Sequence, residues 1–281
     1  MIRIGLAGWG DHDDLYTQGV AARDKLKAYS QHFNVVEVDS SFYAVPALTT
    51  FERWVKETPD DFLFVVKAYQ GMTGHLRDKN PFPDRETMFN AFRDAVQPAV
   101  EAGKLQSVLF QYPSWFDCTR ENVTSLRWAK EAMGDLPVAL EFRHQSWFTP
   151  QMRERTLTFL HKEGWIHSIC DEPQAGDGSV PAVLKATHPG QTVVRMHGRN
   201  AAGWNSGGQP NWRDVRYLYR YSEPELAEWA ERLRLLEKET AHIAVIFNNN
   251  SGGDAAANAK QMMGLLGIEY EGPAPRQLDL F

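Results

Sequence analysis

Charged side chains alternate with apolar ones at the end of two short hydrophobic runs. In residues 138–143, Glu141 and Arg143 share one parity, and in residues 192–197, Arg195 and His197 do. Successive side chains of a strand point to opposite faces, so each charged pair must lie on the face opposite to that of the apolar residues between them. Carboxylate, guanidinium and imidazole groups transfer protons and bind anions. The two runs therefore predict a polar site where the strands end.

Polar residues close most of the other apolar runs. By the same parity Glu37 and Asp39 point inward from residues 35–38, and Lys67 and Tyr69 point inward from residues 62–68. The remaining polar residues at or just after strand ends are Gln111, His144, Asp171, Arg199, Asn248 and Asn249. Burying several charges costs more than filling the same volume with apolar side chains, which favours a ligand pocket. The alternative is a set of ion pairs that only plugs the mouth of the fold.

The residue types suggest roles in such a pocket. Arg143, Arg195 and Arg199 would hold a phosphate group, Glu37 or Glu141 would act as general base, and His197 would act as general acid. The remaining ligand-binding candidates are Lys67, Tyr69, Gln111, His144, Asp171, Asn248 and Asn249.

A metal site is a second interpretation of the same residues. No HExxH or similar ligand pair occurs in the sequence. A divalent metal could still bind where ligands converge from different strands, and the candidates are Glu37, Glu141, His144, Asp171 and His197. Lys67, Arg143 and Arg195 would compete for these carboxylates, so the sequence leaves the metal open.

Two glycine-rich segments adjoin the expected pocket. Residues 248–254 lead into an alanine-rich helix, where backbone N–H groups could bind phosphate, although a plain capping loop with Ser251 or Asp254 as N-cap is the alternative. Residues 204–212 contain two tryptophans and are typical of a lid.

Alternating strand and helix patterns indicate how these residues are positioned. Eight short apolar runs occur at residues 2–7, 35–38, 62–68, 105–111, 138–143, 165–170, 192–197 and 242–248. Helical spacing is found between most of them, at residues 26–33, 51–57, 86–101, 123–133, 152–162, 224–238 and 255–266. This order predicts a single-domain α/β (β/α)₈ TIM barrel over residues 1–271, with an irregular sixth unit at residues 173–190 and an extended tail at residues 272–281.

Composition narrows the class of protein. The 281 residues carry 30 Lys and Arg against 36 Asp and Glu, a net charge of −6, which disfavours nonspecific wrapping of nucleic acid by bulk positive charge. No apolar run reaches the roughly 18 residues of a membrane span, so we expect a soluble cytoplasmic protein without membrane contact. The two cysteines, Cys118 and Cys170, give neither a disulfide framework nor a thiolate zinc site.

Seven short blocks carry a resemblance to a known family. They are residues 7–9, 36–43, 64–67, 109–113, 141–144 with Trp147, 194–199 and 247–249. These blocks resemble the YecE/YunF family, also called domain of unknown function seventy-two, and residues 11–13 resemble its YunF branch. The resemblance covers almost the whole chain and implies a TIM barrel, but it implies no reaction.

The last five residues carry a second resemblance. Gln277-Leu278-Asp279-Leu280-Phe281 is similar to the pentapeptide by which bacterial proteins dock on the DNA-polymerase sliding clamp. Gln277 would hydrogen-bond, and Leu278, Leu280 and Phe281 would fill apolar pockets of the partner. The alternative is an apolar tail that folds back on the barrel.

Together these features favour an accessory protein of DNA repair or replication. Its barrel would bind or hydrolyse a small anionic, phosphorylated ligand derived from nucleic acid, and the clamp would bring it to DNA. The rival hypotheses are a non-catalytic ligand-binding barrel and a metabolic isomerase or hydrolase of a small sugar phosphate.

Overall fold

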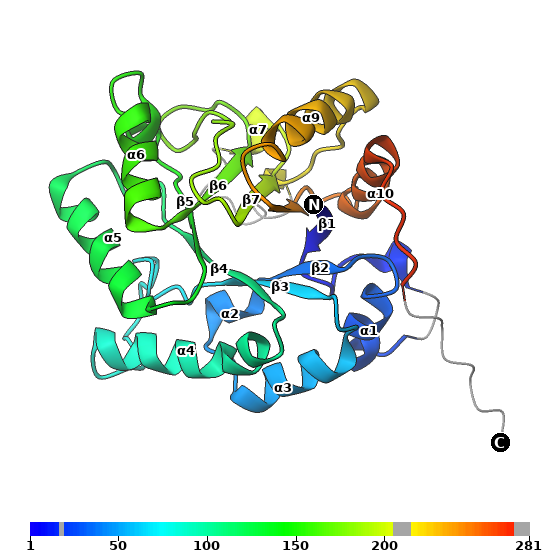
Figure 1. Ribbon diagram of the computed structural model, residues 1–281, viewed down its shortest axis with the longest axis horizontal. Helices are drawn as coiled ribbons and strands as arrows, with labels where there is room; N and C mark the ends of the chain where they lie inside the picture. Colours follow the sequence, from blue (N-terminus) through cyan, green and yellow to red (C-terminus); the bar gives the residue numbers. More distant parts are fainter. Residues whose placement is uncertain (17–19, 205–214, 273–281) are drawn as a thin grey trace.

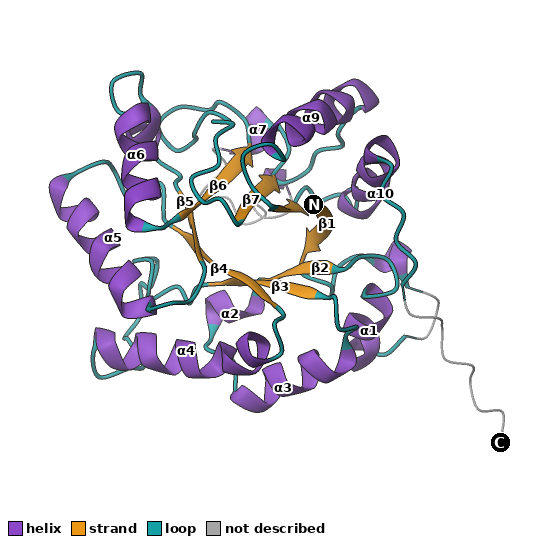
Figure 2. Ribbon diagram, in the orientation of Figure 1, coloured by secondary structure: helices purple, strands orange, loops and turns teal. Residues whose placement is uncertain are grey.

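Eight parallel strands pair in chain order and close into a barrel, because β8 returns to pair with β1. In this computed structural model, residues 1–16, 20–204 and 215–272 are described. Figure 1 and Figure 2 show the helices arranged around the ring of strands. The strands are β1 (Ile2–Ala7), β2 (Val35–Val38), β3 (Leu63–Lys67), β4 (Leu105–Gln111), β5 (Val138–Glu141), β6 (Ile166–Asp171), β7 (Gln191–Met196) and β8 (His242–Phe247). The predicted single-domain TIM barrel is confirmed.

Helices follow most of the strands and cover the outside of the barrel. They are α1 (Lys25–Tyr29), α2 (Ser40–Tyr43), α3 (Leu48–Glu57), α4 (Arg85–Glu101), α5 (Arg120–Met133), α6 (Arg153–Glu163), α7 (Ala201–Trp204), α9 (Glu223–Leu236) and α10 (Ala255–Leu266). Three short 3-10 turns are also present: η1 (Asp13–Leu15), η2 (Ala22–Asp24) and η3 (Gln145–Phe148). None of the helices among the described residues is long and apolar enough to cross a membrane.

Local sequence explains where several helices begin and end. The Asp84 carboxylate accepts a hydrogen bond from the Thr87 amide at the start of α4, and Ser222 and Glu225 form a capping box at the start of α9. At the end of α6, Gly164 adopts a left-handed conformation with φ of 73°, which suits a residue without a side chain.

The core has two layers. Larger side chains fill the space between strands and helices, whereas a smaller cluster fills the middle of the lumen. The members of this inner cluster are Val35, Val65, Leu109, Ala139, Ile166, Val193, Ala244 and Ile246. Each lies one or more two-residue steps before the polar group that ends its strand, as the alternation predicts. The inward parity is therefore confirmed for Glu37, Glu141, Arg143, Arg195 and His197, which are all buried.

The expected elements differ from the observed ones mainly at their ends. The helix expected over residues 26–33 ends at Tyr29, and turn hydrogen bonds carry the chain from there to Phe33. No helix or strand forms over residues 173–190, so the irregular sixth unit is confirmed. The short helices α2 and α7 have too few residues to show a periodic pattern and were not expected. Most of the lid predicted at residues 204–212 lies outside the described residues.

Candidate functional site

Arg195 is the centre of a charged network at the carboxyl ends of the strands. Its Nε and Nη2 donate to the two carboxylate oxygens of Glu37, at 2.8 and 2.5 Å. Its Nη1 donates to both oxygens of Glu141, at 3.0 and 2.9 Å, and to Oε1 of Gln111 at 3.3 Å. Bidentate contacts of this kind fix the geometry of both partners. Arg195 therefore joins β2, β4 and β5 to its own strand, β7.

A second guanidinium extends the network. Arg143 Nε donates to Glu141 Oε1 at 2.6 Å, and Arg143 Nη1 donates to Glu172 Oε2 at 2.7 Å. The other oxygen of Glu172 accepts the Val180 amide at 2.6 Å. Ser168 Oγ adds a longer hydrogen bond to Glu141 Oε2 at 3.4 Å. We call Glu37, Glu141, Arg143, Glu172, Arg195 and His197 the buried network.

His197 accepts hydrogen bonds from the network. Its Nε2 lies 2.9 Å from Arg143 Nη2 and 3.3 Å from Arg195 Nη1, and both of these groups can only donate. Its Nδ1 contacts the side-chain amide of Asn248 at 3.0 Å. Burial, and then the charges of Arg143 and Arg195, lower the pKa of His197 well below its usual value. A neutral imidazole does not suit the predicted role of general acid.

The carboxylates of the network differ in pKa. Burial would raise the pKa of Glu141, but the guanidiniums of Arg143 and Arg195 outweigh it and hold that pKa well below the usual range. Burial raises the pKa of Glu37 to about 7 in spite of Arg195, and it raises the pKa of Glu172 to about 7 in spite of Arg143. Two of the three carboxyl groups can therefore change protonation near neutral pH.

Less buried side chains adjoin the network. The side chains of its six members are at most 4% exposed. Lys67 and Asp39 are 15% and 36% exposed, and they form an ion pair of 3.3 Å. Gln111 and Asn248 are also partly exposed. Gln111 hydrogen-bonds to Arg195, and Asn248 hydrogen-bonds to His197. We call Asp39, Lys67, Gln111 and Asn248 the mouth residues, since they are partly exposed and lie beside the network.

Asp171 and Arg199 belong to a separate cluster. Arg199 makes a bidentate contact with Asp171 and a further ion pair with Glu225 at 3.2 Å. Tyr221 OH donates to Asp171 at 2.7 Å and accepts the Gly198 amide at 2.9 Å. Asp171 has the outward parity of β6, which turns it away from the lumen. Arg199 faces carboxylates on several sides, and this arrangement opposes its predicted contact with phosphate.

Three other predicted ligand-binding residues lie outside the network. Tyr69 packs with the outer core, its ring 5.9 Å from that of Phe82. Its prediction as an inward residue was wrong, because a turn begins at Tyr69, whose carbonyl accepts the Met72 amide at 2.8 Å, and the strand alternation does not extend into this turn. His144 Nδ1 contacts Ser146 Oγ at 2.7 Å at the start of η3. Asn249 is buried and donates to the Tyr219 carbonyl and to Asn258 Oδ1.

The structure bears on the capping alternative for the loop before α10. Asp254 occupies the N-cap position without a side-chain hydrogen bond to the helix, so the simple capping alternative is not observed for it. Its carboxylate also adds negative charge where a phosphate would bind, although Arg220 lies 3.9 Å away.

Sequence reasoning missed Glu172 and Cys170 as site residues, whereas it placed Trp204 at the start of the predicted lid. Ile166 lies in the lumen, so the alternation along β6 places Ser168, Cys170 and Glu172 inward, and extending the parity past the strand would have found Glu172. Trp204 lies over the network, with its ring centre 5.3 Å from the Arg143 guanidinium carbon. Nothing in the spacing of the sequence indicates that contact.

One set of donors in the network has the spacing of a metal site. Glu141, Cys170 and His197 place their ligand atoms within 4.8 Å of one another. Two of the five metal candidates from the sequence, Glu141 and His197, are in this set, but their lone pairs accept hydrogen bonds from Arg143 and Arg195. Burial raises the pKa of the Cys170 thiol well above its usual value, so it stays protonated. This donor set does not fit a divalent cation.

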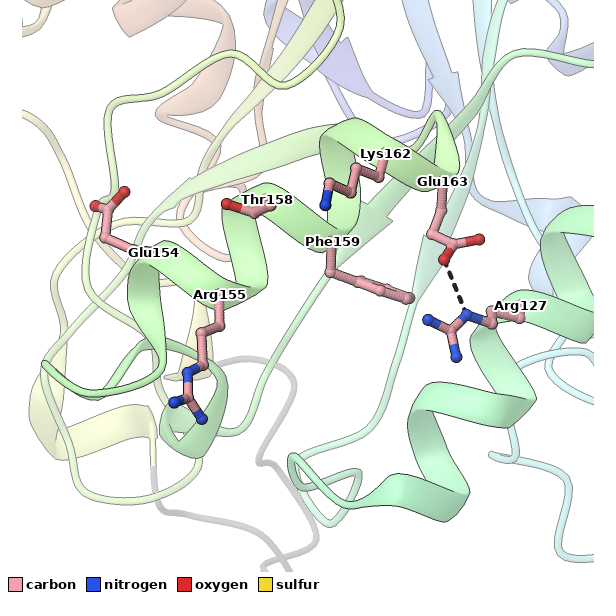
Figure 3. Close-up of a pocket in the computed structure, with 7 residues that line it drawn as sticks. All are labelled: Arg127, Glu154, Arg155, Thr158, Phe159, Lys162 and Glu163. Carbon is pink, nitrogen blue, oxygen red and sulfur yellow. Dashed lines mark hydrogen bonds and ion pairs between the residues drawn. The ribbon is translucent and has the colours of Figure 1, made fainter.

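A cavity of about 390 Å³ lies on the outer surface, away from the strand ends. Figure 3 shows it between α5 and α6. Arg127 and Glu163 form an ion pair of 2.8 Å across it. Its charged side chains alternate in sign, which is typical of a solvated groove between two helices. The remaining lining residues are Glu154, Arg155, Thr158, Phe159 and Lys162.

The fold and the charged network define a TIM-barrel protein with ionisable groups gathered at the carboxyl ends of its strands. The model of one family, described as "Protein of unknown function DUF72", matches residues 3–279, and the chain belongs to this family.

Relatives and solved structures agree with this assignment. The chain is 58% identical to the UPF0759 protein YunF of Bacillus subtilis over 282 residues, covering 100% of both chains. It is 27% identical to the UPF0759 protein YecE of Escherichia coli K12 over 247 residues, covering 82% of each. The crystal structure of a DUF72 family protein from Enterococcus faecalis V583 superposes with a TM-score of 0.93 at 37% identity, covering 99% of this chain and 100% of that one. A DUF72 protein from Thermotoga maritima superposes with a TM-score of 0.80 at 29% identity, covering 95% and 99%.

Proposed function

We propose that the mouth of the barrel binds a small phosphorylated ligand derived from nucleic acid and hydrolyses its phosphoester. The observation that carries this proposal is the buried network itself. It places three carboxylates, two guanidiniums and an imidazole in one hydrogen-bonded group at the end of the lumen where TIM barrels hold their active sites. Desolvating so many charges is expensive, and apolar side chains would fill the space at lower cost.

The contacts in the structure redistribute the roles predicted from the sequence. Arg143 and Arg195 are committed to carboxylates, so they position other groups and do not hold phosphate themselves. Lys67 is the cation among the mouth residues, and its partner Asp39 is itself 36% exposed, so Lys67 would bind the phosphate together with the amides of Gln111 and Asn248. Glu37 would accept the proton of the attacking water and return it to the departing ester oxygen, so that the alcohol leaves protonated, because burial raises its pKa to about 7.

Calorimetry and phosphate release test this proposal. We expect the full chain to bind inorganic phosphate and thymidine 5′-monophosphate, and to release phosphate from the latter. Lys67→Ala should weaken binding at least about tenfold, whereas Glu37→Gln should preserve binding and abolish release. Lys162→Ala, on the outside of α6, is the matched control. Assays with and without Mg²⁺ test metal dependence. Binding without release by the wild type would establish the non-catalytic alternative, and no binding would contradict the proposal.

We propose further that residues 277–281 dock this protein on the cytoplasmic sliding clamp, in DNA repair or replication. The support is the sequence of the pentapeptide, since residues 273–281 lie outside the described residues. A short peptide buries little area, so the affinity should be on the order of micromolar.

Clamp binding is tested with the purified bacterial clamp, the full chain and a version that ends at Gly272. Leu280→Ala/Phe281→Ala should abolish binding, as should the truncation. Undiminished binding by the truncated chain would contradict this proposal. It would favour the alternative of a metabolic isomerase or hydrolase of a small sugar phosphate.

A further inference from the structure

Four aromatic rings form a row on the face of the barrel where the strands end. Phe42 and Tyr43 belong to α2, directly after β2, and their ring centres are 5.3 Å apart. His75 follows β3 and lies 5.2 Å from Phe42, and Trp115 follows β4 and lies 5.8 Å from His75. Each contact is edge to face. We call these four residues the aromatic ridge. It comes from three segments that are far apart in the sequence.

The ridge is held firmly at its centre and is open at both ends. Thr73 Oγ1 contacts His75 Nδ1 at 2.9 Å, and the Phe42 carbonyl accepts the Gln70 amide at 2.9 Å. The two end rings, Tyr43 and Trp115, are each 58% exposed. Large aromatic side chains usually bury most of their surface, so two open rings on a fixed support are typical of a surface that stacks on a partner.

Two cations lie against the ridge. Lys67 Nζ is 4.9 Å from the centre of the Phe42 ring, and the Arg77 guanidinium carbon is 5.9 Å from the centre of the Trp115 ring. Within the described ranges of the chain, no carboxylate lies at ion-pair distance from Arg77. Burial, followed by Lys67, Arg143 and Arg77, lowers the pKa of His75 to about 4, so its ring is neutral at physiological pH. The ridge therefore offers flat apolar faces beside positive charge.

We propose that the aromatic ridge binds unpaired nucleobases, with Arg77 and Lys67 contacting the phosphates that flank them. Every base has a flat π face, so aromatic side chains stack on single strands with little regard to sequence, and neighbouring cations follow the backbone. A base pair inside a duplex hides both faces of its bases, which excludes intact double strands. This inference rests on the proposed function, because Lys67 is shared with the mouth and a base on Phe42 would direct its phosphate there.

A free nucleotide and a single strand offer the same chemistry, and the length of the probe separates them. We would measure fluorescence anisotropy of labelled oligothymidylate of eight nucleotides at low salt, with thymidine 5′-monophosphate and the matching duplex as competitors. If the ridge follows a strand, the monophosphate competes at least about tenfold more weakly than the unlabelled octamer. Equal competition would assign the ridge to free nucleotides, and preferred binding of the duplex would contradict the inference.

Variants of the ridge and matched surface variants complete the test. Trp115→Ala and Tyr43→Ala should each weaken octamer binding about tenfold. Arg77→Ala should weaken octamer binding several-fold. It should also lower the number of counterions released on binding, measured from the salt dependence of the affinity, by about one. Leu235→Ala and Arg155→Ala, exposed on α9 and α6, should change neither value. Circular dichroism checks that every variant is folded.

The two proposals can fail separately. If Trp115→Ala and Tyr43→Ala bind the octamer as the wild type does, the ridge inference is wrong, even where phosphate still binds at Lys67. If the octamer depends on the ridge but inorganic phosphate does not bind, the ridge stands and the proposed hydrolysis falls. Binding of a neutral oligosaccharide in preference to the octamer would also overturn the ridge inference.

Discussion

The middle and the upper end of the barrel lumen are built on the same strands but have opposite chemistry. The middle is filled by small and branched apolar residues such as Val35, Leu109 and Ile246. Two residues further along these strands lie Glu37, Gln111 and Asn248, which join the buried network or hydrogen-bond to it. Backbone hydrogen bonds between the same neighbouring strands surround both regions.

The contrast indicates that the charges are not needed to close the barrel. Apolar side chains pack the middle layer at low cost, and they would pack the upper layer too. The upper layer instead carries ion pairs whose members depend on one another. The proposed role in binding and catalysis would account for this difference, and the following predictions test the contrast between the two layers.

Removing Arg195 should have the largest effect. Arg195→Ala leaves Glu37 and Glu141 buried without their shared partner, so we expect a loss of about 3–5 kcal/mol in the free energy of unfolding. Ile246→Val, in the apolar layer below, should cost only about 0.5–1.5 kcal/mol. Urea denaturation followed by circular dichroism measures both. Equal losses would show that the two layers do not differ in this way.

Replacing an ion pair by apolar residues should recover part of that loss. Glu37→Leu and Arg195→Met are each expected to destabilise the barrel, because the first removes one of the two carboxylate partners of Arg195 and the second leaves Glu37 and Glu141 without their shared partner. The double variant removes both charges and makes this part of the upper layer resemble the middle. We expect it to be more stable than the sum of the single variants predicts, by about 1–3 kcal/mol in a double-mutant cycle. An additive result would contradict direct coupling of the pair.

The network should also make stability depend on pH. The pKa of Glu172 is raised from 4.5 to about 7, so the folded protein binds more protons than the unfolded chain in that interval. Its contribution is therefore fully present below pH 4.5 and is lost as the pH rises through about 7.

Glu172→Gln isolates this contribution. The wild type should lose stability relative to the variant as the pH rises over the same interval, whereas the opposite contributions of His75 and His167 are common to both proteins and cancel. Denaturation curves at several pH values measure the difference, and a constant difference would refute the raised pKa of Glu172.

Substitutions in the aromatic ridge should have the smallest effect on the free energy of unfolding. Trp115 is 58% exposed, so Trp115→Ala should change the free energy of unfolding by no more than about 0.5 kcal/mol. The same denaturation experiment measures it. A loss comparable to that of Arg195→Ala would mean that Trp115 has a structural role and would remove the contrast between the ridge and the network.

Parity along the strands predicted much of the network but not its internal contacts. The alternation correctly turned Glu141, Arg143, Arg195 and His197 inward, because every residue of a parallel barrel strand has a fixed face. It misplaced Tyr69, because a turn begins at that residue after the end of β3. Asp171 was predicted only because it follows the expected strand at residues 165–170, whereas the parity of the lumen residue Ile166 selects Glu172. A shift of one residue reverses the face of a side chain.

The sequence by itself determined the order of strands and helices, the closed barrel and the polar end of its lumen. These follow from local periodicity and from the rule that consecutive parallel strands pair. Only the tertiary structure decided that Arg143 and Arg195 face carboxylates and not solvent, and that Phe42, His75 and Trp115 form one row. The reason is physical: these contacts join strands and loops separated by tens of residues, and their partners are set by the register and closure of the barrel, which no local pattern encodes.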